Sequence, residues 1–287
     1  MLYKKLYNPH SEIIYSIIIP IYNQENTVAD NLKSVIDNTE GNYEIIIILD
    51  YCFDNTEKNL MEFINSYKNV LCNFIQITIL KNENLPLFET KCDNIGFKLA
   101  EGKFCLEIQA DMKMTELGYN IHLSKPFNIL ENVIAVSGRC AHNLFNHRQG
   151  IGKLGSAIEK TVNELNISKN KFYVYETCNR GPLLIDRAKL KELNYLNEEV
   201  YFLEDSDHDL FARAYIEKKY ICGYVPIDFY APLYLGSIRN INTYNNCIEY
   251  NINKNERQRL LDIYNKHPGL DKYRLIWEYK PSEIYDI

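Results

Sequence analysis

Several acidic residues stand where the sequence could carry chemistry. Asp50 ends one apolar run, Asp111 follows another within Gln109-Ala110-Asp111, and four acids lie between Glu204 and Asp209. A carboxylate at the end of a strand can accept a hydrogen bond from a nucleobase N–H or a ribose hydroxyl, and a carboxylate in a turn can hold Mg²⁺ or Mn²⁺. The sequence therefore offers carboxylates suited to nucleotide and metal binding.

Each of these acids also has a simpler structural interpretation. Asp50 could form a helix N-cap or an Asx turn, and Asp111 could be an ordinary turn residue. Tyr22, at the end of the first apolar run, could stack on a base or be a rim aromatic. These alternatives remain open for each residue taken singly.

The cluster from Glu204 to Asp209 precedes an apolar, helix-like segment. Helix dipoles favour one or two acids in a first turn, but four acids in six residues exceed that need. Crowded carboxylates raise one another's pKa, so one beside a cleft could act as a general base toward an alcohol. His208 could be a ligand or base, although an exposed or capping histidine is the commoner arrangement.

The elements that position these residues alternate through the first 110 positions. Continuous apolar strands buried on both faces are typical of a parallel sheet, whose ligands bind at the carboxyl ends of the strands. The apolar spacing predicts strands within 13–22, at 43–49, Phe74–Leu80 and Phe104–Ile108, with helices within 26–39, 54–67 and Asn94–Ala100.

The second half is less regular. We expect one α/β unit over 1–238, with a nucleotide-binding half of about 14–112 and an acceptor-side half of about 113–238, and a helical or irregular C-terminal extension over 239–287. The pattern predicts strands at Val133–Ser137 and Gly181–Ile185, helices at Lys153–Leu165 and Asp209–Lys218, and a Tyr- and Asn-rich tail from Tyr244.

Composition narrows the class of protein. With 32 Lys and Arg against 38 Asp and Glu, the net charge is −6, which argues against a nucleic-acid-binding surface. The apolar run near the start is about half the length needed to span a bilayer, and no leader pattern precedes it. The eight cysteines are scattered without metal-binding pairs. We therefore expect a cytoplasmic globular protein with reduced thiols and no transmembrane segment.

Taken in order, five segments resemble the nucleotide-sugar-dependent glycosyltransferases of the GT-A fold, of the family 2 type. The resemblance covers roughly residues 14 to 235. Its segments are SIIIPIYNQE from Ser16, EIIIILDYCFDNT from Glu44, CDNIGFKLAEGKFCLEIQAD from Cys92, NRGPLLIDRAKLKELNYLNEE from Asn179 and DHDLFARA from Asp207. It implies an α/β fold with a mostly parallel central sheet flanked by helices.

The resemblance also implies roles for individual residues. Asp50 would bind the base, Asp111 would hold Mn²⁺ or Mg²⁺, and Asp207 would be the catalytic base, with Asp205 in a competing register. Gln109 would occupy the place of the first acid of a DxD motif. The nucleotide site would be lined by Pro20, Tyr22, Glu25, Asn94, Gln109 and Ala110.

Some positions differ from the family pattern. Gln109 replaces a carboxylate, Asp93 stands where an Arg commonly precedes the Asn of Asn-x-Gly, and Ser206 replaces a Glu.

The expected function is metal-dependent transfer of a sugar from a nucleoside-diphosphate sugar, with UDP as the expected nucleotide, to an acceptor hydroxyl of a glycan, protein or lipid. We expect inversion at the anomeric carbon, although the fold also supports retention. The alternative is a degenerate domain that binds nucleotide or glycan without turnover. A sugar-nucleotide pyrophosphorylase fits poorly, because PIYNQENT contains no glycine for a phosphate loop.

Overall fold

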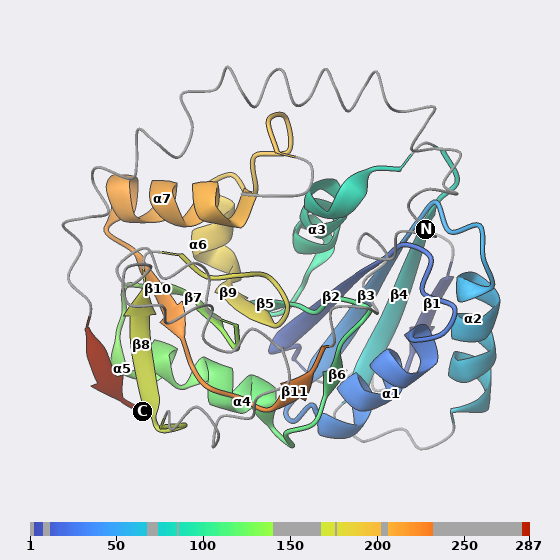
Figure 1. Cartoon of the computed structure of the whole chain (residues 1–287), viewed down its shortest axis with the longest axis horizontal. Helices are drawn as coiled ribbons and strands as arrows, with labels where there is room; N and C mark the ends of the chain where they lie inside the picture. The colour runs from blue at the N-terminus through green and yellow to red at the C-terminus, as the bar shows by residue number, and fades with distance from the viewer. Residues whose placement is uncertain are drawn as a thin grey trace.

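The structure is a computed structural model that describes residues 3–7, 12–67, 74–84, 86–139, 168–175, 177–201, 206–231 and 283–287. Its first half is a parallel sheet in which β4, β3, β2 and β5 lie side by side, with β1 antiparallel to β4 at the edge (Figure 1). These strands are β1 (Tyr3–Leu6), β2 (Tyr15–Ile21), β3 (Tyr43–Asp50), β4 (Phe74–Asn82) and β5 (Phe104–Glu107).

Alternate residues of the central strands enter two separate apolar cores. In β2, Ile17 and Ile19 pack into one core and Ile18 into the other; in β3, Ile45 and Ile46 divide in the same way. A strand that is apolar on both faces needs cover on both sides. The continuous isoleucine runs are therefore explained by a sheet with helices on each face.

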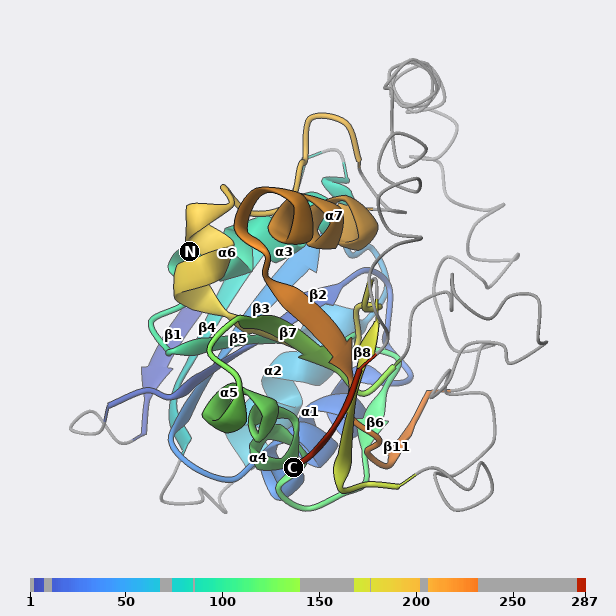
Figure 2. The same ribbon diagram turned by 90° about the vertical axis from the view of Figure 1, so that its left-hand side faces the viewer.

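The helices form the outer two layers (Figures 1 and 2). One face of the sheet is covered by α3 (Phe88–Leu99), α6 (Arg187–Glu192) and α7 (Ser206–Lys218). The other is covered by α1 (Val28–Asn38), α2 (Thr56–Ser66), α4 (Tyr119–Ser124) and α5 (Pro126–Ile129). Among the described residues, none of these helices has the length and hydrophobicity that a bilayer crossing requires.

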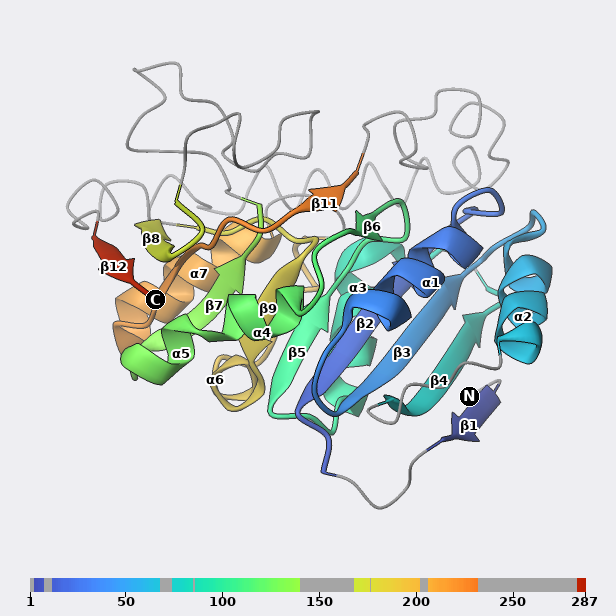
Figure 3. The ribbon, with the colours of Figure 1, turned by 90° about the horizontal axis from the view of Figure 1, so that it is seen from below.

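The second half of the sheet mixes both strand directions. β9 lies antiparallel between β5 and β7, and β10 runs parallel to β7 and antiparallel to β8. The strands are β7 (Val133–Ser137), β8 (Lys171–Tyr175), β9 (Leu183–Asp186), β10 (Ile221–Tyr224) and β12 (Ile284–Asp286), with a separate pair formed by β6 (Lys113–Met114) and β11 (Phe229–Tyr230) (Figure 3).

Three expectations are corrected by these elements. α3 begins at Phe88, six residues before the predicted start, and α7 begins at Ser206 rather than Asp209. The end of the chain was expected to be helical or irregular, yet β12 adds a strand to the sheet beside β8. The predicted helix Lys153–Leu165 and the tail from Tyr244 to 282 lie outside the described residues.

A cluster centred on Glu116 joins segments of the two sheets. Its carboxylate accepts hydrogen bonds from His122 Nδ1 (2.7 Å), from Lys169 Nζ (2.6 Å) and from the backbone N–H of Asp228 (2.9 Å). Burial alone would raise the pKa of Glu116, but these donors outweigh it and lower the pKa to about 2.

We predict that Glu116→Gln destabilises the protein by about 2 kcal/mol at pH 7, because hydrogen bonds to an ionised acceptor are lost. The folded pKa lies below the ordinary value of 4.5, so this stability is present above about pH 4.5 and disappears as the pH falls toward about 2. Urea unfolding of both proteins from pH 7 to pH 3 tests this.

The control is Glu62→Gln, which removes an exposed carboxylate 4.0 Å from Lys58 and should change stability by less than about 0.5 kcal/mol. A stability difference for Glu116→Gln that stays constant with pH would contradict the prediction.

Candidate active site at the carboxyl ends of the strands

Two aromatic rings lie just beyond the carboxyl ends of β2 and β3. The rings of Tyr22 and Phe53 meet edge to face, with centroids 6.1 Å apart, and Phe53 is 54% exposed. Pro20 lies within β2 opposite Ile48 of β3. The rim therefore presents an aromatic surface of the kind on which a nucleobase can stack.

Glu25 holds the loop after β2 against the start of α2. Its carboxylate accepts hydrogen bonds from the backbone N–H (3.0 Å) and the side-chain amide (2.8 Å) of Asn55, and these bonds lower its pKa. The backbone N–H of Glu25 donates to Asp54 Oδ2 (3.1 Å). The structure thus gives Glu25 a role in shaping the loop, and its predicted contact with a nucleotide stays a prediction.

Asp50 binds the start of α3. Its buried carboxylate accepts hydrogen bonds from the backbone N–H groups of Leu87 and Phe88, both at 2.9 Å, and from Asn82 Nδ2 at 2.7 Å. Phe88 has a φ of +65°, an uncommon conformation for a large side chain. Asp50 is thus the last residue of β3 and not the N-cap residue of a following helix, although its carboxylate binds the first N–H groups of α3, whose first residue lies 38 positions further along the chain; base binding stays a prediction.

The Gln109-Ala110-Asp111 turn follows β5 and is held by α1. The backbone N–H of Met112 donates to the carbonyl of Gln109 (3.1 Å). The side-chain amide of buried Asn31 donates to the carbonyls of Gln109 (3.0 Å) and Met112 (2.7 Å). Ala110 is buried beneath the turn, and Asp111 is partly exposed. The turn that carries Asp111 is thus held in place by Asn31 of α1.

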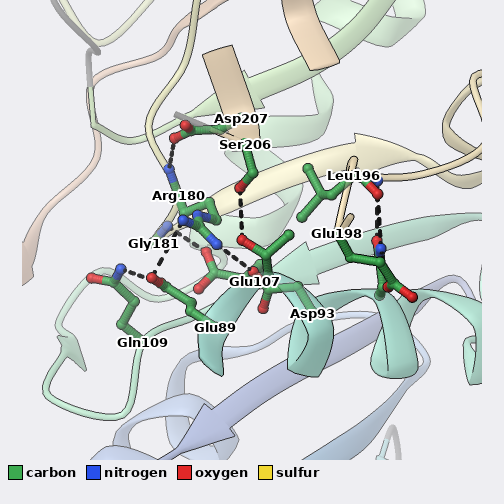
Figure 4. A network of polar contacts seen from close by, with 12 residues as sticks. Glu89, Asp93, Glu107, Gln109, Arg180, Gly181, Leu196, Glu198, Ser206 and Asp207 are labelled. Atoms are coloured by element: carbon green, nitrogen blue, oxygen red, sulfur yellow. Dashed lines mark hydrogen bonds and ion pairs between the residues drawn. The ribbon is translucent and has the colours of Figure 1, made fainter. Parts of the chain in front are cut away.

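A buried ionic network joins this turn to the second half of the chain (Figure 4). The guanidinium of Arg180 contacts Asp93 at 2.9 Å and Glu89 at 3.3 Å. Glu89 Oε1 also accepts from the side-chain amide of Gln109 (2.8 Å), and Glu107 accepts from the backbone N–H of Gly181 (2.5 Å). Glu89, Glu107 and Arg180 were not among the site residues expected from the sequence, where the acid at position 93 was the signal that pointed to an altered charge pattern.

One cation does not balance the charge of this network. Burial raises the pKa of Glu107 well above its ordinary value, and nearby Asp93 and Glu89 add to the effect. Burial likewise raises the pKa of Asp93 to about 7, against the opposing effect of Arg180. Among the described residues, Asp93 Oδ1 and Glu107 Oε1 are buried without a hydrogen-bond partner. The raised pKa values favour the protonated form of these two carboxyls, which reduces the negative charge that Arg180 has to balance.

Gly181 packs directly against the turn. It has a φ of +61°, and a Cβ there would lie 2.6 Å from Met112 Cε and 2.9 Å from Gln109 Cγ. The left-handed conformation and the close approach both require glycine. The side chain of Gln109 is consequently confined between Gly181 and Glu89.

Asp207, in the first turn of α7, lies beside the network. It is 7% exposed, and its carboxylate accepts from the N–H of His208 (2.9 Å) and faces the N–H of Arg180 (3.4 Å). Asp209 instead pairs with Arg213 at 2.8 Å. His208 is buried, in contrast to the exposed or capping histidine that we considered the commoner case, and Asp205 lies outside the described residues.

Asn94 faces the loop after α6. Its amide donates to Leu196 O (2.9 Å) and to Glu198 Oε2 (2.5 Å), and its oxygen accepts from Leu196 N–H (3.0 Å). A cavity of about 400 Å³ lies beside these contacts, with Lys98 and Arg213 in its wall. The structure shows Asn94 anchoring a loop, and its predicted part in cofactor binding stays a prediction.

The donor set at the rim suits a hard divalent cation. Asp111 offers a partly exposed carboxylate beside the strand ends, where oxygen ligands and substrate phosphates can complete a coordination shell. Carboxylate oxygens of Glu89, Asp93 and Glu107 also lie within 4.8 Å of one another. Arg180 already binds two of these three acids and balances part of their charge, and the metal-binding role of Asp111 stays a prediction.

Comparisons with known proteins agree with this geometry. Residues 16–116 match the family described as glycosyl transferase family 2. A UDP-Glc:alpha-D-GlcNAc-diphosphoundecaprenol beta-1,3-glucosyltransferase of Escherichia coli is 24% identical over 67% of this chain and 68% of its own length. Other curated relatives, 23–26% identical, are longer, and the match covers 25–31% of their length.

Solved structures share the fold. A mannosyltransferase from Pyrobaculum calidifontis in complex with GDP-Man and Mn²⁺ superposes with a TM-score of 0.53 at 13% identity, over 76% of this chain and 56% of its own. GalNAc-T7 with UDP, GalNAc and Mn²⁺ gives a TM-score of 0.59 at 14% identity, over 93% and 55%. These similarities show the fold, which is the mixed α/β GT-A arrangement expected from the sequence.

We predict that Asn31→Ala destabilises the protein by about 2–3 kcal/mol, because the Met112 carbonyl loses a buried hydrogen bond and the Gln109 carbonyl loses one of its two donors. Urea unfolding measures the loss. The matched control is Asn59→Ala, which removes one hydrogen bond to a carbonyl in a less buried place and should cost about 1 kcal/mol or less. Equal losses in the two variants would contradict the special role of Asn31.

Proposed function

We propose that this family 2-like GT-A glycosyltransferase moves a sugar from a UDP-sugar to an acceptor hydroxyl, with Mn²⁺ or Mg²⁺ and with inversion at the anomeric carbon. The observation that carries the proposal is the approach of Asp207 to the Gln109–Asp111 turn, through Arg180 and Glu89. The fold brings a prospective base and a prospective metal ligand from distant segments to one edge of the sheet.

The donor would lie across the carboxyl ends of β2, β3 and β5. Its base would stack near Tyr22 and Phe53, and its diphosphate would lie beside Asp111. A bound divalent ion would neutralise the negative charge that develops on the departing nucleotide. Asp50 would accept from the base only if a ligand replaced or shared its bonds to Leu87 and Phe88.

Asp207 would serve as the general base. Its carboxylate takes the proton of the acceptor hydroxyl while that oxygen forms a bond to the anomeric carbon. The bond from the anomeric carbon to the diphosphate oxygen breaks, and its electron pair leaves with UDP. Attack from the face opposite the leaving group inverts the configuration.

Asp207 is held for this role by two backbone N–H groups. The N–H of His208 fixes Oδ1, and the N–H of Arg180 faces Oδ2. Both donors belong to the main chain, and no side chain among the described residues is hydrogen-bonded to this carboxylate. Asp209, bound to Arg213, is not suited to the same task.

A second candidate is a domain that binds nucleotide without turnover. Three observations favour it: Gln109 replaces an acid, Asp93 replaces an Arg, and the carboxylate of Asp50 is already bonded to Leu87 and Phe88. It differs from the enzyme in one measurable respect. UDP would bind, but no donor would be consumed.

We predict that one donor in a panel of UDP-sugars and GDP-mannose releases its nucleotide in the presence of Mn²⁺. Asp111→Asn and Asp207→Asn should each reduce the rate by at least about 100-fold, because a metal ligand and a general base contribute on that scale. Nucleotide release measured by a coupled phosphatase assay tests both roles, and adding candidate acceptors tests transfer.

Asp37→Asn is the matched control, since Asp37 is an exposed partner of Lys33 on α1 and should leave the rate unchanged. UDP binding by calorimetry without release from any donor would support the binding-only domain. Release that survives Asp207→Asn would contradict the base assignment.

A further inference from the structure

Glu89 is the member of the buried acidic network that reaches the surface. Its side chain is 20% exposed, whereas Asp93 and Glu107 are fully buried. It lies in the first turn of α3, at the carboxyl edge of the sheet and next to the side chain of Gln109 (Figure 4). Any molecule that binds along this edge can therefore reach Glu89 before the other two acids.

The carboxylate of Glu89 is held rigidly. Oε1 accepts from Gln109 Nε2 at 2.8 Å, and Oε2 lies 3.3 Å from Arg180 Nη2. Arg180 is anchored in turn by Asp93 at 2.9 Å. Each carboxylate oxygen can accept two hydrogen bonds, so Glu89 can accept further bonds while its position is fixed. Such pre-organisation is typical of a binding group rather than of a solvated surface acid.

Two carboxyl oxygens close to Glu89 have acceptor capacity left over. In the part of the chain that the structure describes, Asp93 Oδ1 and Glu107 Oε1 are buried without hydrogen-bond partners, and Arg180 pairs with Glu89 and Asp93. Acceptors without partners favour a ligand that brings hydrogen-bond donors. The chemistry therefore matches hydroxyl groups.

We propose that Glu89 is a donor-binding residue whose carboxylate accepts a hydrogen bond from a hydroxyl of the nucleotide sugar, on its ribose or on the transferred sugar. The inference rests on the proposed function. Position 109 carries an amide and not a carboxylate, and we infer that Glu89 of α3, which accepts a hydrogen bond from this amide, provides the carboxylate in its place. Asp111 and Glu89 together then provide the two carboxylates of the site.

The test compares Glu89→Gln with wild type by calorimetry, with UDP and with UDP-glucose or UDP-N-acetylglucosamine at saturating Mn²⁺. We expect affinity to fall by about 10- to 100-fold, as is usual for a hydrogen bond to a charged group. A loss for UDP and UDP-sugar alike identifies the ribose hydroxyls. A loss for the UDP-sugar alone identifies the transferred sugar.

Two results would overturn the inference. One is unchanged affinity for every nucleotide. The other is a variant that needs a higher Mn²⁺ concentration but binds nucleotide with normal affinity once Mn²⁺ is saturating, which would make Glu89 a metal ligand. If wild type releases UDP and Glu89→Gln binds normally, only this inference fails. If wild type releases nucleotide from no donor, the proposed function fails instead.

The control is Glu192→Gln, which removes an exposed carboxylate that pairs with Lys218 between α6 and the last turn of α7. Nucleotide affinity should be unchanged. The exchange variant Glu89→Gln/Gln109→Glu moves the carboxylate across the same hydrogen bond, and it should recover part of the lost affinity.

Melting temperatures of the single and exchange variants separate binding from stability. A purely structural role predicts that melting temperature falls in Glu89→Gln and recovers in the exchange variant while nucleotide affinity stays constant in the folded fraction. That pattern would overturn the inference. Because affinity is compared in the folded fraction, the comparison holds even if Glu89→Gln folds poorly.

Discussion

The arrangement of the site depends on the burial of one guanidinium. Arg180 is almost inaccessible to water, and burying a charge is costly unless it is paired and hydrogen-bonded. Asp93 and Glu89 provide that pairing from α3, while the main chain of the same residue faces Asp207 at the start of α7. The cost of leaving this charge unpaired fixes α3, the Gly181 turn and α7 relative to one another.

Around this charge, the residues predicted to bind ligands also shape the loops. Glu25 binds Asn55 at the start of α2, Asp50 binds the start of α3, and Asn94 binds the loop near Leu196. Polar side chains at strand ends serve helix termini well, because the first backbone N–H groups of a helix have no internal partner. A rim built in this way is pre-organised before any ligand arrives.

The pattern of charges at the rim differs from the family in a coordinated manner. An acid stands at position 93 where a base is common, and the positive charge next to it comes from Arg180 on another segment. An amide stands at position 109, and a carboxylate 2.8 Å away comes from Glu89. In both cases, the charge that the family pattern has at one position comes from a residue nearby in space. Arg180 provides the positive charge next to Asp93, and Glu89 provides the carboxylate next to Gln109.

The sequence by itself determined the layered architecture of the first half. Runs such as Tyr43 to Leu49 are apolar on both faces, and only a sheet covered by helices on each side can bury them. The start of α3 was not predictable in the same way, because Phe88 has a left-handed conformation and Asp50, which binds its N–H group, lies 38 residues away. β8 and the edge strand β12 are short and half-exposed, so their pattern is weak.

From the sequence, Asp111 was a candidate because it follows an apolar strand, and Asp207 was separated from the rest of its acidic cluster only by the resemblance to the family pattern. Only the tertiary structure decided that Glu89, Gln109, Arg180 and Asp207 meet, because they come from four segments. Charge pairing acts over a few ångströms in a low-dielectric interior, whatever the separation along the chain. One-dimensional spacing carries no record of such contacts, and the folded sheet is what brings them together.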